Sequence, residues 1–402
     1  MPPTAPAATP LAQLRALVDD DAGLREALFR PDDDATFVTL AVAHARAHGL
    51  ALSGDEVEAA MCARPAGRFA PAAVTTRLPP TGWLPSRAAW HAGELLVEWL
   101  YFGGRPLREP FFENSVARCR HKPFNRLFGV ATPIGALTAA RGRQVQPSGL
   151  IFHMSRCGST LVAQMLAAMP QNRVVSEASP IDAVVQARQV RPDLSEAEHA
   201  AWLGGIVGAF GQFGGGAERH LVLKLDAWHT LALPLFRRAF PRVPWVFLYR
   251  EPVEVLVSQI RQPGIHTVLG LIDPDAFGID ASLAPPAPED YRALVLAAIC
   301  DGVLQHGGAD EALFINYRQL PSAAWTAMMP HFGLPCSDDD RALMAQAARY
   351  DAKKPYSEFV DDGDAKHRAA TPAVRAAAAA RLGERYDRLE SLRVARQSEP
   401  RV

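Results

Sequence analysis

The segment Ser155–Thr160, SRCGST, has the residue types of an anion-binding loop. It stands between an apolar stretch, LIFHM, and a segment with helical spacing. Gly158 permits a tight turn at this junction, so backbone N–H groups can face one ligand and the helix start adds positive potential. Arg156 supplies a permanent charge, and Ser159 and Thr160 supply hydroxyl donors. The segment is predicted to hold a phosphate or sulfate group.

A second basic position follows another apolar stretch, WVFLY, where the chain continues as REPVEVLVSQ. Arg250 ends the expected strand, and Ser258 lies eight residues further on, two turns into a helical pattern. Both side chains can converge on one anion. Together with the first loop, this pattern predicts a ligand with two separated phosphate-type groups.

Five short apolar segments alternate with helical patterns from residue 149 onward. They cover residues 150–154, 173–176, 220–225, 245–249 and 313–316. Such alternation is typical of a parallel sheet covered on both faces. We predict an α/β fold, a three-layer sandwich with a parallel central sheet and P-loop-like topology. Its chemistry should lie at the carboxyl ends of the strands.

The chain before this sheet is predicted to contain two further parts. Residues 1–65 should form a small all-α domain, since apolar residues recur at helical spacing and Ser53–Glu56 spells a capping box. Residues 66–147 comprise a linker and then an aromatic-rich stretch interrupted by Gly and Pro, typical of a packed irregular subdomain; the Pro-, Ala- and Arg-rich composition of the linker begins at residue 65 and ends at residue 80. Residues 148–402 make up the sheet domain.

Composition excludes several classes of protein. The 42 Lys and Arg residues are balanced by 43 Asp and Glu residues, which argues against a nucleic-acid binder that depends on neutralising phosphates. The five cysteines lack a CxxC pair, so neither a zinc ribbon nor a disulfide framework is indicated. Neither a secretory signal nor an apolar run of membrane-spanning length is visible. We therefore expect a cytoplasmic protein without a membrane or nucleic-acid partner.

SRCGSTL followed by YREPVEVLVSQ resembles the two nucleotide-binding motifs of the sulfotransferase family, which uses 3'-phosphoadenosine 5'-phosphosulfate (PAPS) without a metal. The resemblance covers roughly residues 148 to 392. It implies that the first motif holds the 5'-phosphosulfate and the second the 3'-phosphate. The matched positions are Arg156, Cys157, Gly158, Ser159 and Thr160 in the first motif and Arg250 and Ser258 in the second. Cys157 replaces the more usual serine, contributes its N–H, and brings a thiol near the cofactor.

Transfer of a sulfuryl group to a hydroxyl or amine requires a base that accepts the acceptor's proton. The resemblance implies Glu177, in VVSEASP, as this base. Cytosolic members use the histidine of a Lys-x-His strand end, but here the strand reads Lys224-Leu225-Asp226. Lys224 can stabilise charge on the leaving group, and Asp226 and the nearby His229 are alternative bases. Lys366, before the last helix, loosely matches a basic loop that covers the 3'-phosphate.

Two other functions remain open. The apolar strand that ends in Asp226 imitates a Walker B acid, so a P-loop phosphotransferase that uses ATP and magnesium is the alternative enzyme. Against it, Gly158 stands where the Walker A lysine is expected. The first 65 residues also resemble the small helical domain shared by nitrogen-fixation-associated proteins and some peptide leaders. This resemblance implies contact with a peptide or protein, and a non-catalytic nucleotide-binding protein would recruit a partner there. The acceptor, a small molecule or a peptide, has no motif of its own.

Overall fold

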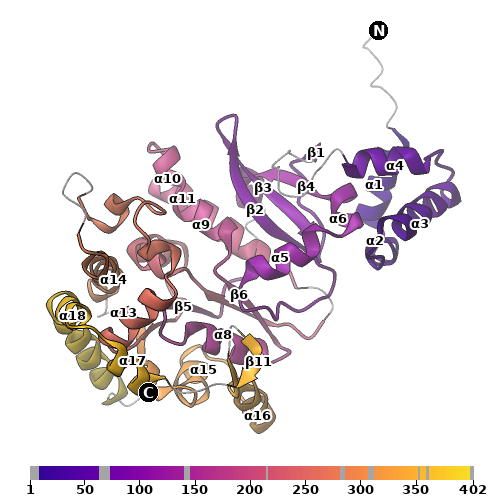
Figure 1. Cartoon of the computed structure of the whole chain (residues 1–402). Coiled ribbons are helices and arrows are strands. Elements are labelled where there is room, and N and C mark those ends of the chain that lie inside the picture. Colours follow the sequence, from indigo (N-terminus) through magenta and orange to yellow (C-terminus); the bar gives the residue numbers. More distant parts are fainter. Residues whose placement is uncertain are drawn as a thin grey trace.

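A five-stranded parallel sheet forms the centre of the computed structural model, which describes residues 9–62, 73–139, 145–213, 216–280, 286–306, 312–351, 354–358 and 362–398 (Figure 1). The strand order is β6-β7-β5-β8-β9. The strands are β5 (Gly149–His153), β6 (Asn172–Ser176), β7 (His220–Lys224), β8 (Trp245–Tyr249) and β9 (Ala312–Asn316). All residues of β5, β6, β8 and β9 are buried, as expected for parallel strands covered on both faces. The predicted α/β fold class is confirmed.

The central position of β5 determines which strand ends meet. It pairs with β7 on one side, where Ile151 lies opposite Lys224, and with β8 on the other, where His153 lies opposite Leu248. Because all pairings are parallel, the loops that follow β5, β7 and β8 leave the sheet at the same edge. The sequence motifs at 155–160, 224–226 and 250 are therefore neighbours in space.

Helices surround this sheet (Figure 1). They are α8 (Ser159–Ala167), α9 (Ser179–Val185), α10 (Ala187–Val190), α11 (Glu196–Phe210), α12 (Leu233–Ala239), α13 (Pro252–Arg261), α14 (Pro288–Leu304), α15 (Met329–His331), α16 (Asp338–Ala347), α17 (Gly363–Ala369) and α18 (Pro372–Ser398). Helix α8 contacts α16, whereas α11 contacts α9 and α12. Helix α18 packs on α14, α13 and β9 at one end of the sheet. A short antiparallel pair, β10 (Tyr350–Asp351) and β11 (Lys354–Glu358), lies between α16 and α17 in the chain.

The aromatic-rich stretch is a regular sheet, which corrects the predicted irregular subdomain. Strands β1 (Ala73–Val74), β2 (Trp83–His91), β3 (Glu94–Tyr101) and β4 (Val130–Pro133) have the order β1-β4-β3-β2, with helices α5 (Phe112–Arg120), α6 (Pro123–Phe128) and α7 (Ile134–Ala139). The β2–β3 hairpin turns at Ala92 and Gly93, which both have positive φ. This geometry usually carries Asn-Gly, so the hairpin has no recognisable turn signal in its sequence.

Packing explains the aromatic density of this second sheet. The rings of Trp90 and Trp202 lie 6.2 Å apart, and those of Phe112 and Phe210 5.2 Å apart, so aromatic residues of the second sheet and α5 pack on α11. Residues 65–72 of the predicted linker lie outside the described residues, and the linker prediction is wrong at Ala73–Val74, which form β1 and pair with β4.

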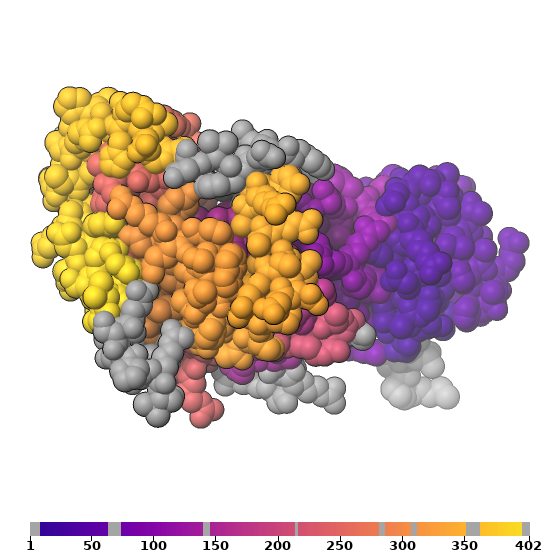
Figure 2. All heavy atoms as spheres, turned by 90° about the horizontal axis from the view of Figure 1, so that it is seen from below, coloured from indigo at the N-terminus to yellow at the C-terminus, as the bar shows by residue number. Residues whose placement is uncertain are grey.

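Four helices form the N-terminal part, as predicted. They are α1 (Pro10–Asp20), α2 (Ala22–Phe29), α3 (Asp34–Ala47) and α4 (Gly54–Cys62). The predicted capping box is present, because the Glu56 N–H donates to the Ser53 hydroxyl and the Ser53 N–H donates to the Glu56 carboxylate. The ammonium of the buried Lys122 donates to the Phe29 carbonyl at 2.9 Å and joins α2 to the start of α6. Figure 2 shows these helices (indigo) and α18 (yellow) at opposite ends of the molecule.

Two further observations concern the cysteines and the helices. All five cysteines are free thiols. Within the described ranges, we find no helix with both the length and the apolarity required to span a membrane.

Candidate functional site

The predicted anion-binding loop connects β5 to α8 in a strained backbone conformation. Gly158 precedes α8 with φ +85°, and Ser155 and Arg156 also have positive φ, at 71° and 53°. Positive φ in non-glycine residues costs about 1–3 kcal/mol each and is concentrated at functional sites. A Cβ at Gly158 would lie 2.8 Å from Leu320 Cδ1 and 2.9 Å from the Tyr317 ring, so any side chain there would force these neighbours to shift. The loop is therefore held in a conformation that its own residues do not favour.

A cavity of about 720 Å³ opens at this loop. The predicted residues that line it are Ser155, Arg156, Cys157, Gly158, Ser159, Thr160, Glu177, Asp226, Arg250, Ser258 and Lys366. The other two, Lys224 and His229, are 1% exposed and lie behind this wall, in contact with Glu177 and Asp226 respectively. The fold thus brings all the predicted site residues together at one edge of the sheet.

Arg250 and Lys366 form the second cationic part of the cavity. The Arg250 guanidinium donates to the carboxylates of Glu254 and Asp362, the latter at 3.1 Å. The Lys366 ammonium lies 2.7 Å from Asp362. Although burial alone would lower it, the Tyr317 and Glu254 groups raise the pKa of Arg250 above its usual value. This cluster is suited to binding an anion.

Ser258 and Tyr317 complete the surroundings of Arg250. The Ser258 hydroxyl lines the cavity and donates to the Glu254 carbonyl at 2.8 Å, so it has to rotate away from that carbonyl to donate to a bound anion. The Tyr317 ring stacks against the Arg250 guanidinium, whose carbon is 3.8 Å from the ring centroid. Arg250 is thus fixed from two sides, and its position does not depend on a ligand.

Lys224 and Glu177 form an ion pair at the ends of β7 and β6. His153 Nε2 lies 3.4 Å from the same Glu177 oxygen. Burial alone would raise the pKa of Glu177, but the Lys224 ammonium and the His153 ring outweigh it and hold that pKa well below its usual range. Glu177 also has positive φ, 51°. It is therefore an ionised carboxylate on a strained strand end.

The tautomer of His153 follows from its hydrogen bonds. The Ser155 N–H donates to Nδ1 at 3.0 Å, and Nε2 lies 2.9 Å from the Leu225 carbonyl oxygen. Because Nδ1 accepts, the proton resides on Nε2. Burial lowers the pKa of His153, so the ring is neutral. It links the anion-binding loop to the Glu177 carboxylate.

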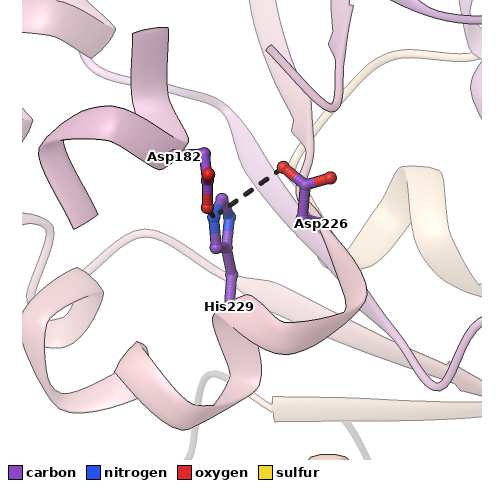
Figure 3. Close-up of side chains that lie close together, drawn as sticks. All are labelled: Asp182, Asp226 and His229. Carbon is purple, nitrogen blue, oxygen red and sulfur yellow. Dashed lines mark hydrogen bonds and ion pairs between the residues drawn. The ribbon is translucent and has the colours of Figure 1, made fainter. Parts of the chain in front are cut away.

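Asp226 and His229 belong to a second polar cluster with Asp182 (Figure 3). His229 Nε2 lies 2.9 Å from Asp182 Oδ1 and 3.7 Å from Asp226 Oδ2. Burial raises the pKa of Asp226 to about 7. Although burial would lower it, the hydrogen bond to Asp182 and the Asp226 charge raise the pKa of His229. Asp226 is thus a cavity-lining carboxyl group that titrates near neutral pH.

The same three side chains are close enough together to bind a cation. However, Asp182 Oδ1 also accepts from the Trp228 indole at 2.8 Å, and its Oδ2 accepts from Gln186 at 2.6 Å. Hydrogen bonds therefore already engage both carboxylate oxygens of Asp182.

The Cys157 thiol points away from the cavity, which corrects the expectation that it lies near the cofactor. The side chain is fully buried, and Sγ donates to the Leu248 carbonyl at 3.1 Å. Burial raises the pKa of Cys157 to about 12, so the thiolate is not populated at neutral pH. Only the backbone of Cys157 is suited to ligand contact.

Sequence reasoning missed several residues of the cavity wall. Phe111, Asn114, Trp228, His266, Tyr317 and Asp362 line it. Tyr317 directly follows β9, so the rule that strand ends carry the site could have identified it. Phe111 belongs to the second sheet region, and its ring centroid lies 5.1 Å from the Lys224 ammonium. No local pattern signals this contact, since it depends on how the two sheets pack.

No family model matches the chain, and no curated protein matches it. Among solved structures, it is similar to the sulfotransferase domain from the curacin biosynthetic pathway, with 15% identity, a TM-score of 0.37, and coverage of 59% of this chain and 97% of that chain. It is also similar to sulfotransferase STF9 from Mycobacterium avium, with 12% identity, a TM-score of 0.40, and coverage of 62% of this chain and 81% of that chain. The sulfotransferase domain of the Synechococcus PCC 7002 olefin synthase is similar with 15% identity, a TM-score of 0.35, and coverage of 64% of this chain and 97% of that chain. These likenesses are distant.

Proposed function

We propose that this protein is a sulfotransferase that transfers a sulfuryl group from PAPS to a hydroxyl or amine acceptor. One observation carries the proposal: a single cavity contains the glycine turn after β5 and two cationic side chains, Arg250 after β8 and Lys366 in α17. PAPS has two separated anionic groups, and each part of the cavity contains at least one cationic side chain, Arg156 in the first and Arg250 and Lys366 in the second. The cavity volume of about 720 Å³ is within the range typical of small-molecule sites.

The loop Ser155–Thr160 would hold the 5'-phosphosulfate, with Arg156 and backbone N–H groups as donors. Arg250, Ser258 and Lys366 would hold the 3'-phosphate. When bound, PAPS supplies the sulfuryl group, and the protein contributes position and charge, as in phosphoryl transfer. The Lys224 ammonium is buried behind the cavity wall at Glu177, and by turning toward the donor it would stabilise charge that develops on the leaving group.

Glu177 is our choice for the base. It lines the cavity and is ionised because of its ion pair with Lys224. If Lys224 turns toward the donor, Glu177 loses its counter-charge, and its affinity for a proton rises when transfer begins. Asp226 is the alternative base, since it also lines the cavity. His229 is fully buried beside Asp182 and would act by holding Asp226 in place.

The proposal predicts that 3',5'-adenosine bisphosphate binds and that Arg250→Ala weakens its affinity by about 10- to 100-fold, the effect of losing charged hydrogen bonds. Isothermal titration calorimetry measures both affinities. Arg242→Ala is the matched control, because this exposed arginine precedes the amino end of β8. Circular dichroism checks that the variant is folded, since Glu254 loses its partner. Equal affinity of the wild type and Arg250→Ala for the bisphosphate would contradict the assignment of Arg250 to a second anion site.

Activity requires an acceptor, and the direct test is a search for one. Purified protein is incubated with PAPS carrying labelled sulfate and a cell extract, and mass spectrometry identifies which metabolite or peptide gains the label. Thermal shift with ATP and magnesium tests the phosphotransferase alternative. Stabilisation by ATP and magnesium without stabilisation by adenosine bisphosphate would favour that enzyme and contradict our proposal.

A further inference from the structure

Two buried cations share a single carboxylate oxygen in the proposed 3'-phosphate site. The Arg250 guanidinium donates to Asp362 Oδ1 at 3.1 Å, and the Lys366 ammonium lies 2.7 Å from the same atom. This oxygen therefore occupies the position between the two cations that an oxygen of a bound phosphate would need. All three residues line the cavity.

Exposure distinguishes the carboxylate from the cations. The side chains of Arg250 and Lys366 are 5% and 7% exposed, whereas that of Asp362 is 44% exposed. Asp362 directly precedes α17, and its side chain makes no capping hydrogen bond to the helix. Its exposure leaves it room to rotate into solvent when its contacts with the two cations break, while the guanidinium stays fixed by Glu254 and the Tyr317 ring.

We propose that Asp362 is a tethered competitor of the nucleotide's 3'-phosphate, which holds Arg250 and Lys366 between catalytic cycles and lowers the affinity for the nucleotide. This inference rests on the proposed function. Without nucleotide, Asp362 supplies the ion pair of Lys366 and adds a second carboxylate, beside Glu254, for Arg250. A phosphate monoester has a charge of about −1.5 to −2 and several acceptor oxygens, so it displaces the carboxylate.

The competition has a consequence for release of the product nucleotide. Binding must break the contacts of Asp362 with both cations, so the measured affinity is lower than the phosphate contacts alone would give. When the nucleotide leaves, Asp362 re-forms these contacts and compensates the cations. The carboxylate thus assists dissociation of adenosine bisphosphate, a step that often limits turnover in enzymes.

Asp362→Asn tests this role. The amide keeps the shape and an acceptor oxygen but loses the charge, so the affinity for 3',5'-adenosine bisphosphate is expected to rise about fivefold to tenfold, the worth of a partly exposed ion pair. Affinity for adenosine 5'-monophosphate, which lacks the 3'-phosphate, should stay unchanged. The melting temperature without nucleotide should fall, because the cations lose their counter-charge. Calorimetry and thermal unfolding measure these quantities.

Asp364→Asn is the matched control, because Asp364 is an exposed residue of α17 and its substitution changes the net charge by the same amount as Asp362→Asn. Tighter binding by Asp362→Asn alone, confined to the 3'-phosphorylated nucleotide, supports the inference. Unchanged or weaker binding by Asp362→Asn, beside a wild-type protein that binds, overturns it and leaves the proposed function intact. Failure of wild type and both variants to bind the bisphosphate overturns the proposed function, and the inference with it.

Discussion

Glu177→Gln is expected to reduce kcat by about 100- to 10,000-fold, the usual contribution of a general base. Glutamine keeps the size of the side chain but cannot accept the acceptor's proton. The measurement is release of adenosine bisphosphate from PAPS, with the acceptor that the labelling experiment identifies. Asp226→Asn serves as the comparison, and its kcat should fall by no more than about tenfold, because in our assignment Asp226 does not take the proton.

The pH profile distinguishes the two carboxylates independently of the variants. Lys224 and His153 hold the pKa of Glu177 well below its usual range, so this group is ionised throughout pH 5.5 to 9 and gives no inflection there. Asp226 has a pKa of about 7, because it is buried. A base must be deprotonated to act, so catalysis by Asp226 would make the rate rise through pH 7 and level off above it. If the rate of the wild type rises through pH 7 and that of Asp226→Asn does not, Asp226 and not Glu177 is the base.

The strands of the central sheet were predictable because each is buried on both faces. Strand β8, for example, is entirely apolar, and its end is marked by the change to Arg250. The strand order was not predictable in the same way, since no local pattern states that β7 and β8 flank β5. The site could still be inferred, because parallel strands leave their loops at the same edge whatever their order.

Contacts between distant segments account for what the sequence did not reveal. Arg250 and Asp362 are 112 positions apart, so a carboxylate within the proposed phosphate site has no local signature. The division into residues 1–65, 66–147 and 148–402, the cytoplasmic location and the contact of the N-terminal helices with a peptide or protein stay predictions. The loop at 155–160 differs in part, because its turn at Gly158 is a local feature that the sequence indicated, whereas the close approach of Leu320 and Tyr317 to this glycine is not.

Gly158→Ala is expected to lower the free energy of unfolding by about 2–5 kcal/mol, the sum of a left-handed alanine and an overpacked contact. Its new methyl group would lie 2.8 Å from Leu320 and 2.9 Å from Tyr317. Relief of this clash would shift Tyr317, which stacks on Arg250, so both anion-binding parts of the cavity are disturbed. We therefore expect affinity for adenosine bisphosphate to fall at least about 100-fold. Urea unfolding and calorimetry measure the two effects.

Gly270→Ala separates the backbone contribution from the steric one. Gly270 has the same φ, +85°, but nothing lies within 4 Å of the point where a Cβ would stand. An alanine there bears only the left-handed strain, about 1–2 kcal/mol, and leaves nucleotide affinity unchanged. The excess loss in Gly158→Ala then measures the close approach of the loop to Leu320 and Tyr317. Equal losses in the two variants, with nucleotide binding retained, would mean that the loop yields to the added methyl group and that the fixed turn is not what forms the anion site.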